Sequence, residues 1–108
     1  MLIRASLFEK LGGMDESYGL HCEDLDLMYR ASQQGMHCLR VPSARVFHDQ
    51  GLSSKSRPSW VHWQKHLGMQ RFFIKFQAGQ HALPVRWLVL AGIWVRFAVT
   101  WPLIWMKS

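Results

Sequence analysis

The pattern of apolar and polar residues predicts two helices near the start of the chain. Ser6 and Glu9 lie three residues apart in a capping-box pattern that opens a short helix, and the glycine pair at residues 12–13 ends it. A second helix is predicted over residues 23–34, because apolar side chains recur there with helical spacing and Gly35 follows as a stop signal.

The next stretch has the pattern of extended backbone. Residues 37–41 alternate and end at Pro42, which predicts a strand. Residues 44–48 predict a second extended piece, and residues 1–5 predict a third. Helices and strands in this order indicate a small mixed α/β unit in the first half of the chain.

The second half has a different character. Residues 60–77 predict a basic, aromatic helix, which Gly79 and Pro84 separate from the next element. Residues 83–106 hold 18 apolar residues in 24 and predict a long apolar helix. Three of its tryptophans repeat every seven residues and so share one helical face, and a fourth lies one turn beyond: Trp87, Trp94, Trp101 and Trp105.

This last helix is long enough to cross a bilayer, which takes about 20 apolar residues. A central Arg96 costs about 2.5–3.5 kcal/mol in a spanning helix, Pro102 would kink it, and tryptophan prefers the membrane interface. An interfacial or re-entrant helix with its tryptophans among the headgroups fits at least as well as a span. The alternative is a core helix of a soluble protein, for which the chain offers little covering surface.

Charge divides the chain at the same place. All seven acidic residues lie within residues 1–49, which carry a net charge of −2, whereas residues 50–108 carry eight Lys or Arg and no acid. This asymmetry suggests an anionic partner for the second half: a membrane surface, a nucleic acid or a phosphorylated ligand. No nucleic-acid motif accompanies the basic residues, so we expect no nucleic-acid partner.

Composition excludes several classes of protein. An apolar content of 49% is too high for a disordered tail, and two cysteines cannot build a disulfide scaffold. We expect no signal peptide in the first residues, because Arg4 and Glu9 interrupt the apolar run.

Three groups of residues could carry chemistry. Glu23, Asp24 and Asp26 cluster at a predicted helix start, where acids either complement the helix dipole or provide a rigid, ionised general base. His48 ends an extended segment and is either structural or a metal ligand. Lys55 and Arg57 lie in a polar loop that could bind phosphate, although the loop lacks the P-loop pattern.

Three motifs occur in order along the first half: Leu11-Gly12-Gly13-Met14-Asp15-Glu16, then Glu23-Asp24-Leu25-Asp26-Leu27, then Val41-Pro42 leading through Ala44-Arg45-Val46-Phe47-His48 to Gly51, Ser53 and Ser54. With these motifs, residues 1–78 resemble the C-terminal half of a family 2 glycosyltransferase catalytic domain. The similar members are the rhamnosyltransferase-like and galactofuranosyltransferase-like enzymes that elongate bacterial surface glycans.

The resemblance implies the α/β fold called GT-A and an inverting transfer from a nucleotide-sugar donor. It implies that Asp24 is the base that deprotonates the acceptor hydroxyl. Glu23 and Asp26 would lie near acceptor hydroxyls or support the helix. His48 would bind a divalent metal, Mg²⁺ or Mn²⁺, which neutralises the departing diphosphate. The implied acceptor is a lipid-linked or other glycan, at the cytoplasmic face of the inner membrane.

The resemblance also implies that the nucleotide-binding half of such a domain, with its Asp-x-Asp motif, is missing. We therefore expect residues 1–59 to be the acceptor-side part of a catalytic domain and residues 60–108 to be a basic aromatic helix followed by a membrane-associating helix. On this interpretation the chain is a fragment that is inactive alone. The competing hypothesis is a non-catalytic, membrane-associated module or pseudoenzyme remnant.

Overall fold

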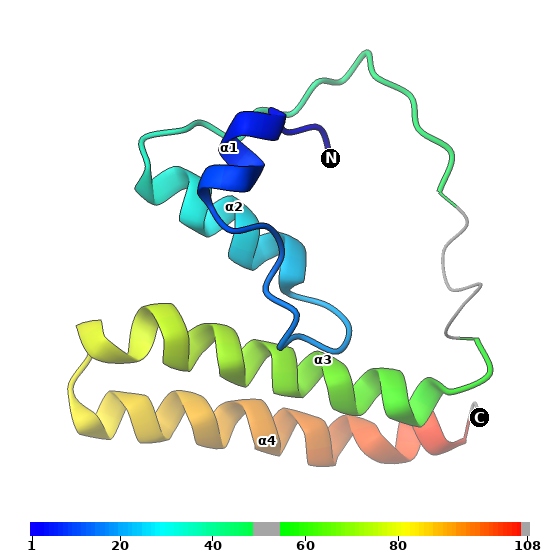
Figure 1. The fold of residues 1–108 in the computed structure, drawn as a ribbon. Helices are drawn as coiled ribbons and strands as arrows, with labels where there is room; N and C mark the ends of the chain where they lie inside the picture. Colours follow the sequence, from blue (N-terminus) through cyan, green and yellow to red (C-terminus); the bar gives the residue numbers. More distant parts are fainter. Residues whose placement is uncertain (49–54, 107–108) are drawn as a thin grey trace.

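The computed structural model describes residues 1–48 and 55–106 (Figure 1). The elements in chain order are the helices α1 (Ala5–Lys10), α2 (Glu23–Gln33) and α3 (Pro58–Phe72), the π-helical turn η1 (Phe73–Gln77), the 3₁₀ turn η2 (Ala78–Gln80) and the helix α4 (Leu83–Trp105). The predicted helices near Ser6, over residues 23–34 and over residues 83–106 are thus confirmed within one or two residues. The predicted capping box is wrong, because α1 begins at Ala5 after Arg4, Ser6 lies inside the helix, and no side chain caps its start.

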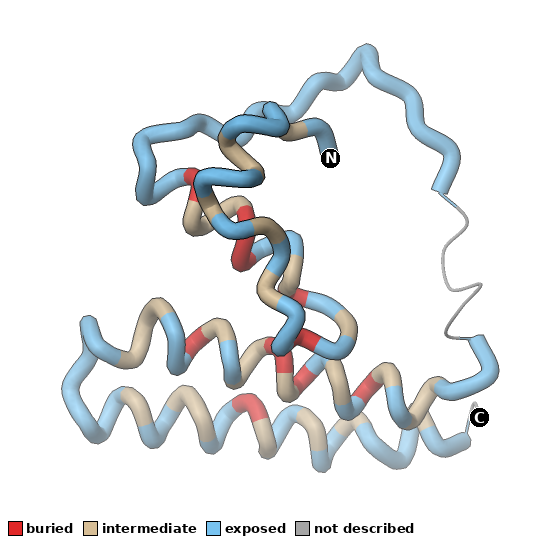
Figure 2. The backbone as a smooth tube through the Cα atoms, in the orientation of Figure 1, coloured by how far each residue is buried: buried red, intermediate tan, exposed pale blue. Residues whose placement is uncertain are grey.

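The helices form three layers (Figure 1). Helix α3, extended by η1, lies in the middle, and α4 runs back beside it as the second arm of a hairpin. On the other side of α3 lies the N-terminal unit, which we define as residues 1–35. Figure 2 shows that the buried positions gather where this unit meets α3, whereas α4 is mostly exposed.

Glycines end the first two helices as the sequence predicts. Gly12, Gly13 and Gly35 have φ of +78°, +74° and +76°, which a residue without a side chain adopts at little cost. A fourth glycine has a packing role. A Cβ atom at Gly68 would lie 3.0 Å from the carbonyl oxygen of His21, so the glycine lets the N-terminal unit approach α3 closely.

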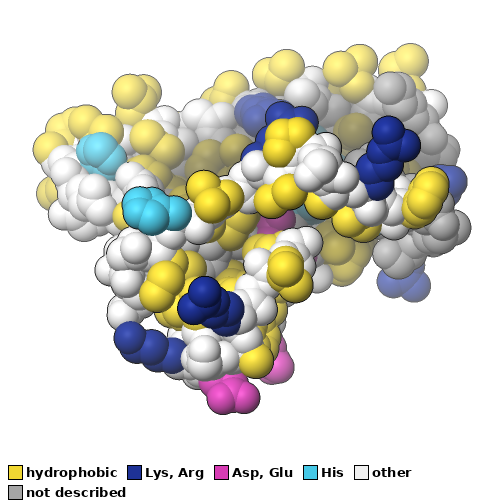
Figure 3. Space-filling model, turned by 90° about the horizontal axis from the view of Figure 1, so that it is seen from above, with side chains coloured by type: hydrophobic (Ala, Val, Ile, Leu, Met, Phe, Trp, Pro, Cys, Tyr) yellow, Lys and Arg dark blue, Asp and Glu magenta, His cyan; other side chains and the backbone are white. Residues whose placement is uncertain are grey.

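The predicted α/β fold is wrong. No strand occurs among residues 1–48 and 55–106, and residues 37–41 run as unpaired, exposed backbone. The alternation of apolar and polar residues is a local feature of the sequence. A strand also needs a neighbouring strand that forms backbone hydrogen bonds with it. None of the described segments takes that place, so apolar side chains such as Leu39 and Phe47 stay exposed. Figure 3 shows hydrophobic side chains lying open on the face seen from above.

Aromatic rings hold the hairpin together. The ring centroids of Trp63 and Trp94 lie 5.2 Å apart, and His62 stacks on Phe97 at 5.0 Å. The indole Nε1 of Trp94 donates a 2.6 Å hydrogen bond to Oε1 of Gln70. A pair of aromatic rings in contact stabilises the fold by about 0.5–1.5 kcal/mol beyond the effect of the buried area. They fix which side of α4 faces α3.

Candidate functional site

The acidic start of α2 follows a sharp turn. His21 and Cys22 both have φ of +68°, a left-handed conformation that costs a non-glycine residue about 1–3 kcal/mol. Cys22 is the residue that precedes the helix, and it is buried against α3 beside Gly68. The turn therefore delivers Glu23 and Asp24 to the first turn of a helix whose position on α3 is fixed.

The three acids of this turn have different surroundings. Asp24 is exposed, and its Oδ1 accepts a 2.8 Å hydrogen bond from the backbone N–H of Leu25. Glu23 is half-buried, and its Oε2 is buried with no hydrogen-bond partner among the residues that the structure describes. Asp26 is completely buried. Of the three, Asp24 is the carboxylate that a substrate in solution can reach.

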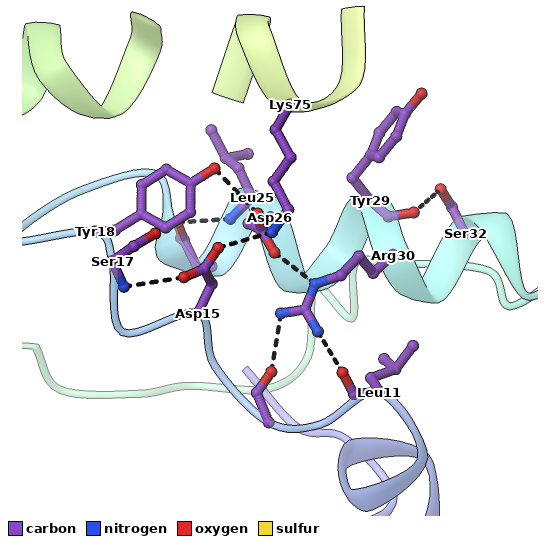
Figure 4. Close-up of polar contacts among 12 residues, drawn as sticks. Leu11, Asp15, Ser17, Tyr18, Leu25, Asp26, Tyr29, Arg30, Ser32 and Lys75 are labelled. Atoms are coloured by element: carbon purple, nitrogen blue, oxygen red, sulfur yellow. Dashed lines mark hydrogen bonds and ion pairs between the residues drawn. The ribbon is translucent and has the colours of Figure 1, made fainter. Parts of the chain in front are cut away.

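Asp26 is the centre of a polar network that joins three parts of the chain (Figure 4). Its Oδ2 accepts hydrogen bonds from the Tyr18 hydroxyl at 3.0 Å and from Nζ of Lys75 at 2.6 Å. Its Oδ1 accepts from Nε of Arg30 at 2.5 Å. Arg30 also donates to the carbonyl oxygens of residues 11 and 13, at the end of α1. This geometry favours helix support over acceptor contact for Asp26.

Lys75 closes the network from η1. Its Nζ lies 2.7 Å from Oδ2 of Asp15 as well as 2.6 Å from Asp26. Burial opposes the charge of Lys75, but its hydrogen bonds to the two carboxylates outweigh this effect and raise its pKa. The same contact, with a second hydrogen bond from Ser17, holds the pKa of Asp15 well below its usual range. Burial, together with the hydrogen bond to Asp26, raises the pKa of Tyr18 well above its usual range.

Most members of this network carry no signal that the sequence alone would reveal. Arg30 could have been found, because it follows Asp26 by four residues and so faces it on one side of a helix. Tyr18 and Lys75 carry no such local signal. Lys75 lies 49 residues from Asp26 in the chain, and only the packing of η1 against α2 brings the two together.

The other predicted site residues lie outside the helices. His48 is exposed at the end of the first described range, and Lys55 and Arg57 are exposed just before α3. Residues 51, 53 and 54 of the third motif lie outside the described residues. Within residues 1–48 and 55–106, no three His, Cys, Asp or Glu side chains come together as metal ligands. The described residues do not form a site for the implied metal, and the role of His48 stays a prediction.

The four tryptophans of α4 form two pairs with different surroundings. Trp94 packs against α3, and the ring of Trp101 lies 6.2 Å from that of His62 and 5.0 Å from that of Phe97. Trp87 and Trp105 are largely exposed, near the two ends of α4. The seven-residue repeat therefore does not form one free face in the structure.

A buried histidine between α3 and α4 makes stability depend on pH. His66 is 1% exposed, its Nδ1 lies 2.8 Å from the carbonyl oxygen of His62, and burial lowers its pKa below 6.5. The nearby charges of Lys65 and Arg96 lower it further. The unfolded chain thus binds the proton more readily, and the stabilisation from a neutral His66 is lost as the pH falls below about 6.5.

We expect the urea midpoint of the native chain to fall between about pH 8 and pH 5. The fall in the midpoint should be smaller in His66→Phe. This variant keeps an aromatic ring against Phe97 but has no titratable group at position 66. Chemical unfolding followed by circular dichroism at several pH values measures both slopes. Equal slopes would assign the pH dependence to other histidines.

The chain is similar in sequence to two kinds of rhamnosyltransferase. It is 31% identical to N-acetylglucosaminyl-diphospho-decaprenol L-rhamnosyltransferase of Mycobacterium tuberculosis over 96 residues, which are 89% of this chain and 31% of that protein. It is 40% identical to rhamnosyltransferase WbbL of Escherichia coli K12 over 48 residues, which are 44% of this chain and 18% of that protein. No protein-family model and no solved structure matches the chain.

The chain therefore spans about a third of the length of the mycobacterial relative. These matches confirm the resemblance that the three motifs carry, to rhamnosyltransferases of glycosyltransferase family 2.

Proposed function

Starting from this resemblance, we propose that the chain provides the acceptor side of an inverting glycosyltransferase, with Asp24 as the general base. The observation that carries the proposal is the division of labour at the start of α2. Asp24 is exposed, whereas Asp26 is buried in a network that holds the helix in place. A base needs both access to substrate and a fixed position, and this arrangement supplies both.

The proposed reaction uses only the carboxylate of Asp24. A positioned carboxylate accepts the proton of the acceptor hydroxyl as the hydroxyl oxygen attacks the sugar carbon, and the nucleoside diphosphate leaves from the opposite side. The N–H of Leu25 donates to Oδ1 of Asp24 and so orients the group. Asp24 lies in the first turn of α2, at the positive end of the helix dipole.

The name of the mycobacterial relative indicates the acceptor class: a sugar carried on a polyprenyl diphosphate. We propose a lipid-linked glycan acceptor of this class and a nucleotide-sugar donor. Because the chain spans about a third of that relative, we expect donor binding to need residues outside these 108. The 108 residues alone are then expected to be inactive.

The test is a chimaera in which the 96 matched residues replace their counterpart in the mycobacterial rhamnosyltransferase. In a chimaera that transfers labelled rhamnose to its lipid-linked acceptor, Asp24→Asn should lower turnover at least about 100-fold, because the amide cannot accept the proton. The matched control is Glu16→Gln, which removes an exposed acid from the same unit. Its turnover should stay within about twofold of the parent chimaera, since it lies outside the proposed machinery.

Near-normal turnover in the Asp24→Asn chimaera would sink the assignment. A second outcome would favour the non-catalytic module instead: a chimaera without transfer activity, together with a native chain that still binds membranes.

A further inference from the structure

Helix α4 presents two different faces. Toward α3 it presents the residues that make the hairpin, among them Ile93, Phe97 and Thr100, which are buried or half-buried. The outward face carries Leu88, Val95 and Val99, and the two valines are 61% and 68% exposed. At 3.6 residues per turn these three side chains lie within about 40° of one another, so they form one stripe along the helix.

The outward face is apolar over the whole length of the helix. Length and composition alone would let α4 cross a membrane, with a mean hydropathy of 1.6, and only 6% of that stretch is buried inside the molecule. Its two charged side chains lie off the stripe. Arg86 turns back to donate to the carbonyl oxygen of His81 at 2.8 Å, and Arg96 lies about 100° around the helix from Val95. A soluble surface seldom leaves so much contiguous apolar area open to water.

Charge indicates what covers this face. Residues 50–108 contain eight Lys or Arg and no acid, so the hairpin that carries the stripe is uniformly basic. A second copy of the same hairpin would repel it, whereas an anionic surface would attract it. Trp87 and Trp105 lie 18 residues apart, or about 27 Å along the helix, and both flank the stripe, about 80° around the helix from Val95. Tryptophan favours the headgroup region of a bilayer.

We propose that the outward face of α4 docks on an anionic membrane, with the helix lying in the membrane plane. A spanning position conflicts with the hairpin. Helix α3 covers the other face of α4 and carries Lys65 and Gln70, and behind α3 lies the Asp26 network (Figure 1). Surrounding α4 with lipid would place these polar groups in hydrocarbon, where unpaired polar groups are costly.

This orientation revises the face that the tryptophan repeat predicts. Trp94 donates its indole N–H to Gln70 and is unavailable to lipid, so the docking face is turned by about 100° from Trp94 toward Val95. The layers also place α2 on the far side of α3 from the membrane. The hairpin of α3 and α4 thus lies between the membrane and α2, which carries Asp24 in its first turn. The docking itself does not rest on the proposed function. Only the meaning of the position of Asp24 for catalysis does.

The experiment compares two double variants of the full 108-residue chain in vesicle flotation, with phosphatidylcholine vesicles that contain or lack phosphatidylglycerol. Val95→Glu with Val99→Glu places two charges on the stripe, at exposed helical positions where glutamate is at least as good a helix former as valine. Val41→Glu with Val46→Glu makes the same chemical change at two exposed valines away from the hairpin. Both variants have the same net charge, and circular dichroism checks the helix content of each.

The native chain should bind vesicles with phosphatidylglycerol, and raising the salt from about 0.1 M to about 1 M should weaken binding, because the Debye length shortens from about 10 Å to about 3 Å. The stripe variant should bind at least about tenfold more weakly than the control variant. With bromolipids, tryptophan quenching should be strongest for bromines near the headgroups.

Three results would overturn the proposal. Equal binding of the two variants would mean that the stripe is not the docking face. Strongest quenching at the bilayer centre would mean a spanning helix. Self-association of the native chain that the stripe variant loses, without vesicle binding, would mean that a second copy covers the face. An inactive Asp24 chimaera changes none of these results, so the two proposals fail separately.

Discussion

Asp26→Ala is expected to lower the free energy of unfolding by about 2–4 kcal/mol, because it removes a fully buried carboxylate and leaves Tyr18, Arg30 and Lys75 without the acceptor that they share. Asp26 is 0% exposed and connects the first turn of α2 to η1 directly and to the end of α1 through Arg30. Removing it therefore loosens the N-terminal unit from the hairpin. Urea unfolding followed by far-ultraviolet circular dichroism measures the loss.

The control for this prediction is Asp15→Ala. Asp15 contacts the same Nζ of Lys75 at 2.7 Å, but both side chains of this pair are partly exposed. An exposed ion pair contributes about 0–1 kcal/mol, so this variant should lose no more than that. If the two variants lost the same stability, the network would depend on Lys75 and not on the buried carboxylate.

Leu27→Ala is expected to cost about 2–5 kcal/mol, because it removes a large side chain that is 1% exposed. Leu27 belongs to α2 and lines an apolar groove of about 540 Å³ between this helix and the first residues of the chain. Leu7 and Ala31 also line the groove. The truncation enlarges a space that this small unit has few side chains to refill. We expect a lower thermal midpoint and weaker protection of α2 amides from hydrogen exchange.

The neighbouring Leu25 is the matched control, since it is 49% exposed on the same helix. Leu25→Ala should change stability by less than about 0.5 kcal/mol. A similar loss in both leucine variants would mean that α2 buries a different face from the one described.

The sequence by itself determined the helices and the residues that end them. Glycines at 12–13 and 35 stop the first two helices, and a run of apolar residues makes the helix over 83–105, because these signals act within one or two turns. The motif around Asp24 also gave the resemblance to rhamnosyltransferases, since residue types at fixed spacing are read along the chain.

Tertiary structure alone decided the remaining features, because each depends on residues far apart in sequence. Whether residues 37–41 form a strand depends on a neighbour to pair with, and the described residues supply none. The different surroundings of Asp24 and Asp26 depend on Lys75, which contacts only Asp26 of the two. The free face of α4 depends on where α3 packs, which takes Trp94 inside the hairpin and leaves Val95 and Val99 outside. Periodicity shows that a helix has faces, but the neighbour that covers one of them is fixed by packing.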